Sequence, residues 1–209
     1  MRIRKSAEAR RLEILQATLR LAGEVGPDRL TTETVAREVG LTQPAVFRHF
    51  ATKQDLWDAV ADYIGKTMEA GWADSAGRSG APEHRLRSLV ATQLCLIQST
   101  PAIPAILFSR ELHSRNVALR KALFALMRRF HGLVARAIAE ARDASVFHDD
   151  LDPDDAAFLV IGLIQGLALR WSLSGRAFGL VEEGRRLLDL QIRGFSREPA
   201  TSAQKRRRG

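Results

Sequence analysis

The segment from Thr31 to Phe50 constrains the fold of this chain more than any other stretch, because its spacing predicts two short helices joined by a tight turn. Gly40 ends the first helix, since glycine tolerates the left-handed backbone of such a turn. Leu41 then places an apolar side chain between the helices. Thr42 can cap the second helix, and Pro44 fits its first turn without losing a hydrogen bond. The segment is therefore predicted to be a helix-turn-helix.

The second helix of this motif is predicted to point polar and small side chains outward. Val46 and Phe50, four positions apart, are expected to face the core. A glutamine in the exposed first turn can pair with adenine in the major groove of DNA, and an alanine there can touch a thymine methyl group. An ordinary helical hairpin with merely solvated Gln43 and His49 is the alternative. The residues left facing outward are Gln43, Ala45, Phe47, Arg48 and His49.

This segment resembles the DNA-binding domain of the TetR family of one-component transcriptional regulators. By that resemblance, the side chains that meet bases would be those of Gln43, Pro44 and Ala45, and the side chains that meet phosphates would be those of Thr32, His49 and Lys53. The residues that match the family pattern are Thr31, Thr32, Val35, Ala36, Gly40, Gln43, Pro44, His49, Phe50 and Lys53.

Two residues depart from the family pattern. The family usually has tyrosine where this chain has Phe47, so a hydroxyl group that would donate to a phosphate is absent and any contact there is apolar. Some relatives carry a basic residue at the position of Glu33, whose carboxylate would repel the phosphate backbone.

The net charge of +8 does not by itself predict a nucleic-acid-binding surface. Residues 1–11 contain five basic residues and one acidic residue, and residues 196–209 contain the same numbers. The part between them is balanced, with 22 basic and 22 acidic residues. The prediction of DNA binding therefore depends on the motif. The basic arm at residues 1–5 could lie along phosphates or be a disordered leader.

The chain carries no predicted disulfide or membrane segment. Its one cysteine, Cys95, lies among Leu94, Leu96 and Ile97, which favours a buried, inert thiol. No apolar run approaches the ~18 residues that a membrane span needs, and the charged start lacks a signal core. A cytoplasmic protein without a membrane partner is expected.

Helical spacing continues along the rest of the chain, without a segment of strand period. Ser6 can cap a first helix that ends at Gly26, and Thr52 with Asp55 predicts the start of a long fourth helix that Lys53 opens. Later helices are expected at 85–99, 102–112, 114–142, from Pro153 to Gly175, and up to Phe195. The predicted fold is all-α with about nine helices.

The predicted domain order follows from this pattern. An arm and helix-turn-helix domain occupies residues 1–52, and a helical regulatory and dimerisation domain that starts with the linking fourth helix occupies residues 53–196. Residues 197–209 lack an apolar stripe and are expected to be a disordered basic tail. The resemblance implies that the fourth helix transmits movement between the two domains.

No metal, cofactor or catalytic site is predicted. The acidic run from His148 to Asp155 lacks the ligand order of a calcium loop, and Asp152 before Pro153 is typical of a helix cap. Four residues that could act as acids or bases form no recognisable constellation, so an enzyme is not expected; they are Glu111, His113, His131 and Glu140.

A small, largely apolar effector is expected in the C-terminal domain, because many aromatic and sulfur-containing residues lie on its helices. Basic residues among the polar candidates favour an anionic or acyl-type compound. Each aromatic residue could instead be simple core. The expected ligand-binding residues are Trp72, Phe108, Arg110, His113, Phe124, Met127, His131, Gln165 and Trp171.

A homodimer is expected through the last two helices, since glycines four apart let a partner helix approach closely. The stripe could instead pack within one chain. The expected interface residues are Gly162, Gly166, Leu187, Leu188, Ile192 and Phe195. The predicted function is a ligand-responsive repressor that binds a palindromic operator. The alternative is a chromosome-organising or adaptor protein that uses the same DNA-binding motif.

Overall fold

The computed structural model describes residues 6–76 and 80–197, and these residues form ten α-helices and no strand. The all-α prediction is therefore confirmed. The basic arm and most of the basic tail lie outside the described residues. The helices are α1 Ala7–Val25, α2 Thr32–Glu38, α3 Gln43–Phe47, α4 Lys53–Ala76, α5 Pro82–Ser99, α6 Ala102–Phe108, α7 Arg110–Arg115, α8 Val117–Asp143, α9 Pro153–Leu173 and α10 Leu180–Phe195.

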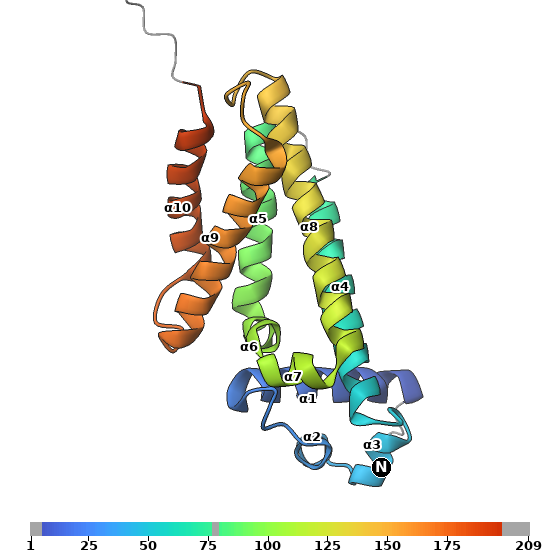
Figure 1. Cartoon of the computed structure of the whole chain (residues 1–209). Helices are drawn as coiled ribbons and strands as arrows, with labels where there is room; N and C mark the ends of the chain where they lie inside the picture. The colour runs from blue at the N-terminus through green and yellow to red at the C-terminus, as the bar shows by residue number, and fades with distance from the viewer. Residues whose placement is uncertain (1–5, 77–79, 198–209) are drawn as a thin grey trace, which may run out of the picture.

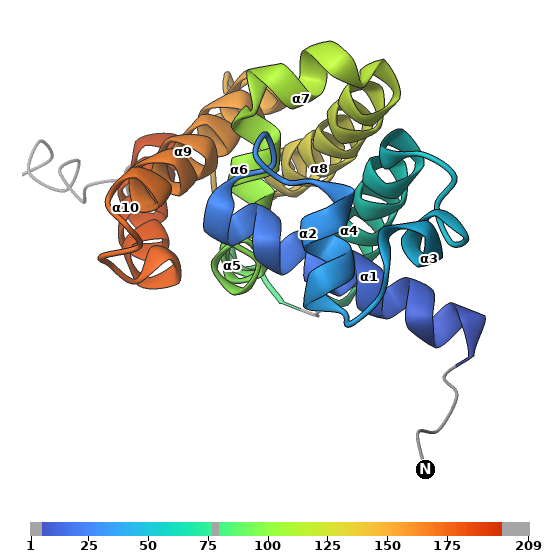
Figure 2. The same cartoon turned by 90° about the horizontal axis from the view of Figure 1, so that it is seen from below.

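The helices form a small N-terminal group beneath a longer bundle (Figure 1). Helices α4, α5, α8, α9 and α10 make up the upright bundle, and α1 crosses its foot. Helices α2 and α3 lie below α1, and the view from below shows them on the same face as the start of α4 (Figure 2). The short helices α6 and α7 lie between α1 and the bundle.

The structure has one helix more than the sequence predicted, because the expected helix at 102–112 is two helices. Ser109 has an extended backbone, with φ −74° and ψ 105°, and its Oγ accepts a hydrogen bond from the backbone N–H of Leu112 at 3.0 Å. Ser109 thus ends α6 and caps α7. The cap of α8 is Asn116 rather than Ser114, the residue predicted to begin this helix, since Asn116 Oδ1 accepts from Leu119 N at 2.9 Å.

Helix α4 joins the two parts of the molecule. It begins with the predicted capping box, in which Thr52 Oγ1 accepts from Asp55 N at 3.0 Å and Asp55 Oδ2 accepts from Thr52 N at 2.9 Å. The buried stripe of α4 runs from Leu56 to Trp72 and contacts α1 near its start and α5 and α8 beyond. The domain division at residue 52 stays a prediction, because α4 packs against both parts.

Most other predicted helix ends are confirmed. Ser6 Oγ accepts from Ala9 N at 3.1 Å, and Gly26, with φ 86°, ends α1. Asp152 caps α9, because its Oδ1 accepts from the N–H groups of Asp154 and Asp155 at 2.9 Å. The acidic run before α9 is therefore a helix start.

Helix α9 corrects the expectation that no segment is long and apolar enough to span a membrane. Residues 153–173 form a helix that is long and apolar enough, with a mean hydropathy of 1.7, and 39% of this apolar stretch is buried. The sequence prediction was based on uninterrupted apolar runs, and Gly162, Gln165 and Gly166 interrupt the apolar stretch of α9, whose charged residues lie only near its ends. Core helices of helical bundles have the same composition, and α9 packs against α8 and α10.

Cys95 is also a correction, because its thiol is exposed. Its neighbours Leu94 and Ile97 face the core, whereas Cys95 lies on the opposite side of α5, in a groove between α5 and α10. Apolar neighbours in the sequence do not decide which side of a helix a residue occupies.

Candidate nucleic-acid interface and effector cavity

The helix-turn-helix is held by local hydrogen bonds. The hydroxyl of Thr31 accepts from Thr34 N at 3.1 Å, and the hydroxyl of Thr34 accepts from Thr31 N at 3.2 Å, so a capping box fixes the start of α2. Gly40 has φ 65°, as the predicted turn requires. Leu41 N then donates to Ala36 O at 2.8 Å. The turn therefore sets α3 against α2 in one orientation.

Helix α3 and the turn after it bury Val46 and Phe50, as predicted, and leave exposed Gln43, Pro44, Phe47 and Arg48. Ala45 differs from the prediction. Only 8% of it is exposed, because it lies beside Val46 on the flank of α3 that packs inward. A methyl group covered in this way presents little surface to a thymine, so the outward face of α3 is narrower than expected.

Two of the predicted DNA-contact residues bind each other. Gln43 Nε2 donates to Thr32 Oγ1 at 2.7 Å, and Thr32 is buried at the start of α2. This hydrogen bond joins the first turns of α2 and α3. Gln43 is thereby oriented before any DNA is present, which reduces the entropy lost when its amide meets a base.

Lys53 and His49 flank the other end of α3. The exposed Lys53 donates from Nζ to Leu30 O at 2.5 Å, so its ammonium group lies over the loop before α2. The carbonyl of His49 accepts from the Arg11 guanidinium at 2.5 Å, and that guanidinium lies 4.1 Å from the centre of the Phe50 ring. Sequence reasoning missed Arg11, since its partners are almost 40 positions away.

The regulatory part contains an apolar cavity of about 80 Å³ bounded by α4, α5, α6, α8 and α9. Its only polar lining residues among the described part of the chain are Gln93 and Gln165. Trp72 Nε1 donates to Gln93 Oε1 at 2.8 Å, and the Trp72 ring lies 5.0 Å from that of Phe130. The remaining lining residues are Ile64, Met68, Ile97, Ile103, Pro104, Ile106, Leu107, Leu123, Leu126, Met127, Ile161, Ile164 and Ala168.

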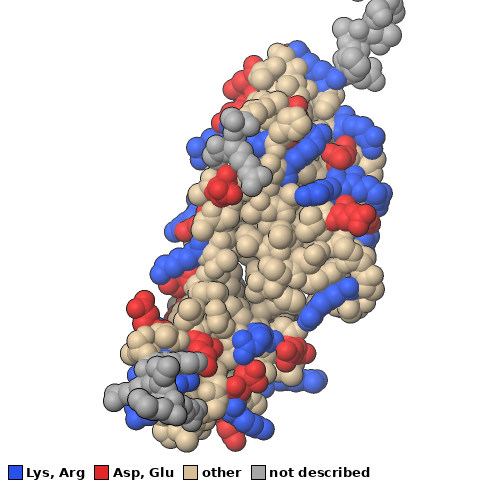
Figure 3. All heavy atoms as spheres, turned by 180° about the vertical axis from the view of Figure 1, so that it is seen from behind, with Lys and Arg blue, Asp and Glu red and all other residues tan. Residues whose placement is uncertain are grey.

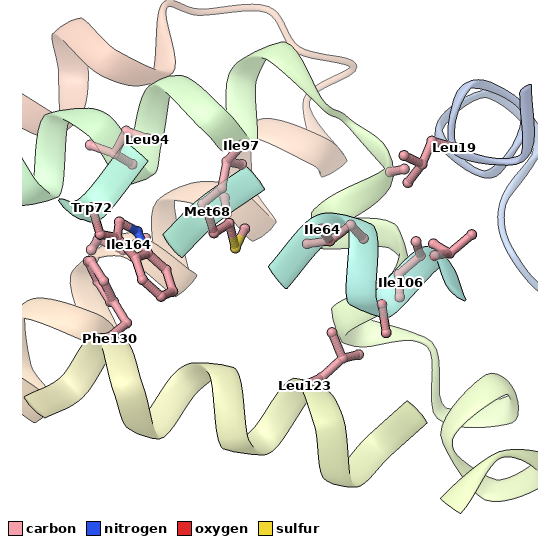
Figure 4. Packing of buried hydrophobic residues seen from close by; sticks show 14 of the residues in the cluster. Leu19, Ile64, Met68, Trp72, Leu94, Ile97, Ile106, Leu123, Phe130 and Ile164 are labelled. Atoms are coloured by element: carbon pink, nitrogen blue, oxygen red, sulfur yellow. The ribbon is translucent and has the colours of Figure 1, made fainter. Parts of the chain in front are cut away.

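Figure 4 shows how this core is arranged along α4. Trp72, Phe130 and Ile164 lie together at one end, with Met68 and Ile97 next to them. Ile64, Ile106 and Leu123 lie at the other end, toward Leu19 of α1. The cavity wall therefore runs from the interior of the bundle toward the N-terminal group.

Three of the expected ligand-binding residues line this cavity, namely Trp72, Met127 and Gln165. Phe108 and Phe124 do not, because both are exposed, Phe124 by 61%. Trp171 is buried elsewhere and donates from Nε1 to Phe178 O at 3.0 Å.

The expected basic lining is also absent from the cavity. Arg110 is exposed, and His113 lies beside the backbone, with Nε2 2.9 Å from Leu107 O. His131 stacks on Phe158 at 4.4 Å between ring centres and lies next to Asp154. The sequence reading favoured aromatic and basic residues, whereas the lining is mostly aliphatic. The aliphatic lining residues could have been predicted from the ordinary core spacing of α4, α8 and α9.

The expected interface residues fall into two groups. Leu188, Ile192 and Phe195 are buried within the chain and leave little surface for a partner, whereas Leu187 is half-buried. A Cβ added at Gly162 or Gly166 would meet nothing within 4 Å. Around these glycines, α9 presents Phe158, Leu159, Leu169 and Leu173, of which Leu173 is 80% exposed. The open apolar face is therefore on α9.

Arg170 of α9 forms an ion pair with Glu183 of α10, and Arg186 pairs with the same carboxylate from within α10. Hydrogen bonds from Arg186 and then Arg170 lower the pKa of the Glu183 carboxyl from 4.5 to about 2. In the loop between these helices, Arg176 donates to Gly23 O of α1 at 2.6 Å. The C-terminal hairpin thus contacts the N-terminal group directly.

Charged side chains are interspersed on the face shown in Figure 3, where Lys and Arg occur beside Asp and Glu. The described residues on this face form no single basic patch, which agrees with the balanced charge of residues 12–195.

Comparison with known proteins decides the family. Residues 14–60 match the family model described as bacterial regulatory proteins, tetR family, and residues 82–181 match the model described as tetracyclin repressor-like, C-terminal domain. The chain belongs to the TetR family. It is therefore a DNA-binding regulator and not an enzyme, and the two matches correspond to the helix-turn-helix part and the helical part of this TetR-family chain.

Curated relatives are distant. The regulator BetI of Burkholderia thailandensis is 29% identical over 175 residues, which cover 82% of this chain and 86% of BetI. The nucleoid occlusion factor SlmA of Vibrio cholerae is 24% identical over 158 residues, which cover 75% of this chain and 81% of SlmA.

Solved structures share the fold. A TetR transcription regulator from Haloarcula marismortui superposes with a TM-score of 0.78 at 24% identity, covering 91% of this chain and 100% of that one. The regulator FadR from Bacillus subtilis, solved with stearoyl-CoA, superposes with a TM-score of 0.72 at 18% identity, covering 88% of this chain and 98% of that one.

Proposed function

We propose that this TetR-family protein is a ligand-responsive transcriptional repressor that binds a near-palindromic operator as a homodimer. The observation that carries the proposal is the apolar cavity beside α4, because α4 also begins at Lys53 next to α3. Such a regulator needs no cofactor, and it works in the cytoplasm, where the chromosome is.

The effector is a small, largely apolar molecule that enlarges the cavity. An apolar cavity of about 150 Å³ can hold benzene, and this one is about 80 Å³, so a compound with more than a few carbons must displace its walls. Ile64, Met68 and Trp72 place α4 in that wall. Displacement of α4 would move Lys53 and α3. The long acyl chain in the FadR structure is consistent with an effector of this kind.

The free-energy difference that this mechanism requires is small. Releasing DNA tenfold requires only about 1.4 kcal/mol of preference for the displaced state of α4. Methylene groups that only the displaced state has room to bury contribute about 0.8 kcal/mol each to this preference, so four or five of them exceed the requirement.

The homodimer forms through the open face of α9. Gly162 and Gly166 let a second helix come close, and Phe158 and Leu173 supply apolar area around them. This revises the expected interface, since the apolar stripe of α10 is already buried within the chain. A twofold axis here would place two copies of α3 in successive major grooves, about 34–36 Å apart.

Selection from a library of random DNA duplexes tests the operator. The recovered sequence is expected to be twofold symmetric, with half-sites separated by about one helical turn of 10–10.5 base pairs. Recovery of duplexes with no common sequence, at an affinity equal to that of unselected DNA, would contradict the proposal.

A chromosome-organising or adaptor role is the second candidate, and the likeness to SlmA is the observation that favours it. The number of binding sites separates the two functions. Chromatin immunoprecipitation is expected to find one or a few sites beside regulated genes. Many scattered sites, with no response of DNA binding to apolar compounds, would favour the second function.

A further inference from the structure

The effector cavity has no charged lining residue among the described residues, so an ionised group has no counter-charge inside it. Burying an unpaired charge there would cost far more than the apolar contacts return. An effector that carries a charge must therefore keep that charge outside the cavity. Such a charge requires a part of the surface that adjoins the cavity and can bind a charged group.

A groove of about 540 Å³ between α4 and α8 adjoins the cavity at Trp72, which lines both. Trp72 is held by one hydrogen bond to Gln93 and by the Phe130 ring. In Figure 4, Trp72 and Phe130 lie at the end of the core that is remote from α1. Rotation of the Trp72 indole would connect the groove with the cavity. The other residues of the groove are Glu69, Ala73, Arg128, Arg129, Gly132, Leu133 and Arg136.

The groove carries uncompensated positive charge. Arg129 is paired with Glu69, but Arg128 and Arg136 have no ion pair or hydrogen bond with the described residues, and both are exposed. These two arginines lie four positions before and after Gly132, so they share one face of α8. A Cβ at Gly132 would meet nothing within 4 Å. The result is a hollow one helical turn long on each side of Gly132, with a guanidinium at either end.

We propose that this hollow binds the anionic head of an amphiphilic effector whose alkyl or acyl tail passes Trp72 into the cavity. Guanidinium groups suit this role, because they bind carboxylate and phosphate oxygens through paired N–H donors. Leu133 and Ala73 add apolar surface to the same groove. This inference rests on the proposed function of the cavity, and it assigns the effector to the class of single-tailed anions.

Calorimetry with two probes of equal tail length tests the inference. Decyl phosphate, below its micelle concentration, and 1-decanol, below its solubility limit in water, are titrated into the wild-type protein. Decyl phosphate is expected to bind about fivefold tighter, and added salt should reduce only that difference. Arg128→Gln with Arg136→Gln should bring decyl phosphate to the affinity of decanol and leave decanol unchanged.

Two further variants sharpen the test. Arg120→Gln with Lys121→Gln removes the same number of positive charges from α8 outside the groove and should leave the affinities for both probes unchanged. Gly132→Leu fills the hollow without a clash and should weaken decyl phosphate alone. Equal affinities of the two probes in the wild type would contradict the proposed head-group site, and so would a double variant that still prefers decyl phosphate. Neither result would contradict the proposed function of the cavity. Failure of both probes to bind would instead contradict the cavity's proposed function.

Discussion

Lys53 and Gln43 belong to one motif but are expected to contact different parts of the DNA. Lys53 lies at the start of α4 with its ammonium group on the loop before α2, where a phosphate could replace the carbonyl of Leu30. Gln43 lies in the first turn of α3 and is oriented by Thr32. We therefore assign backbone contact to Lys53 and base contact to Gln43.

Substitution of these two residues should give different results. Lys53→Ala is expected to weaken operator and random DNA alike and to reduce the slope of log affinity against log salt by about one. Gln43→Ala should lower the preference for operator over random DNA. Anisotropy titrations at several salt concentrations measure both. If the two substitutions reduced affinity by one common factor on every sequence, the assignment would be wrong.

The sequence predicted which side chains of α3 and the following turn are buried, except at Ala45. Periodicity placed Val46 and Phe50 in the core, and Gly40 fixed the turn. It could not place Ala45, because a five-residue helix is too short for spacing to distinguish a flank from an outer face. The prediction that Phe108 and Phe124 line the cavity failed for a related reason. Helical spacing shows that a helix has an apolar face, but it does not show which neighbouring helix packs on that face.

Helices α10 and α5 approach each other closely at Gly184. A Cβ at Gly184 would lie 2.2 Å from Leu94 Cδ1, and Leu94 is fully buried. Gly184→Ala must therefore push a packed side chain, and the expected cost is about 1–3 kcal/mol of unfolding free energy. Gly194→Ala, on the same helix but in open space, should instead raise it by about 0.5–1 kcal/mol. Urea denaturation compares the two, and equal effects would show that α10 does not pack on α5 as described.

The pairing of Arg170 and Arg186 with Glu183 makes a prediction about acid stability. Because the pKa of Glu183 is lowered to about 2, its contribution is complete above the ordinary value of 4.5 and is lost as pH falls toward 2. Melting temperatures between pH 5 and 3 should therefore fall less in Glu183→Gln than in the wild type. The difference should shrink at high salt, since the pair is accessible to solvent. Parallel pH profiles at low salt would refute the pairing.

At the element scale, the sequence located most helix starts but not the break at Ser109. Caps such as Ser6, Thr52 and Asp152 carry local hydrogen bonds that the sequence reveals. Ser109 interrupts a continuous apolar stripe, and its hydroxyl also donates to Asp28 Oδ1 in the loop after α1 at 2.5 Å. A contact with a residue 81 positions away is invisible to local spacing.

The position of a dimer interface depends on which apolar helix faces are not already buried within one chain. Both α9 and α10 carry apolar stripes, but α10 buries its stripe against α5 and α9, whereas α9 leaves Phe158 and Leu173 exposed. Sequence alone could not decide between the two stripes, because burial within one chain and burial in a dimer require the same residue types.

Dimer formation through α9 predicts the effect of filling its open face. Gly166→Trp should not disturb the single chain, since nothing lies within 4 Å of an added Cβ, but it should prevent close approach of a second α9. Sedimentation velocity is expected to show a monomer. The matched control Gly132→Trp, also in open space but on α8, should remain a dimer. A Gly166→Trp protein with an unchanged dimer would place the interface elsewhere.

Operator affinity with and without 1-decanol tests most directly whether the cavity controls DNA binding. In the wild type, saturating decanol should raise the melting temperature and weaken operator binding by about tenfold. Ala168→Leu extends a side chain that lines the cavity, so this variant should bind the operator normally and no longer respond to decanol. A wild-type protein whose melting temperature rises with decanol while its operator affinity stays constant would contradict the account, because the cavity would then bind a ligand without moving α4.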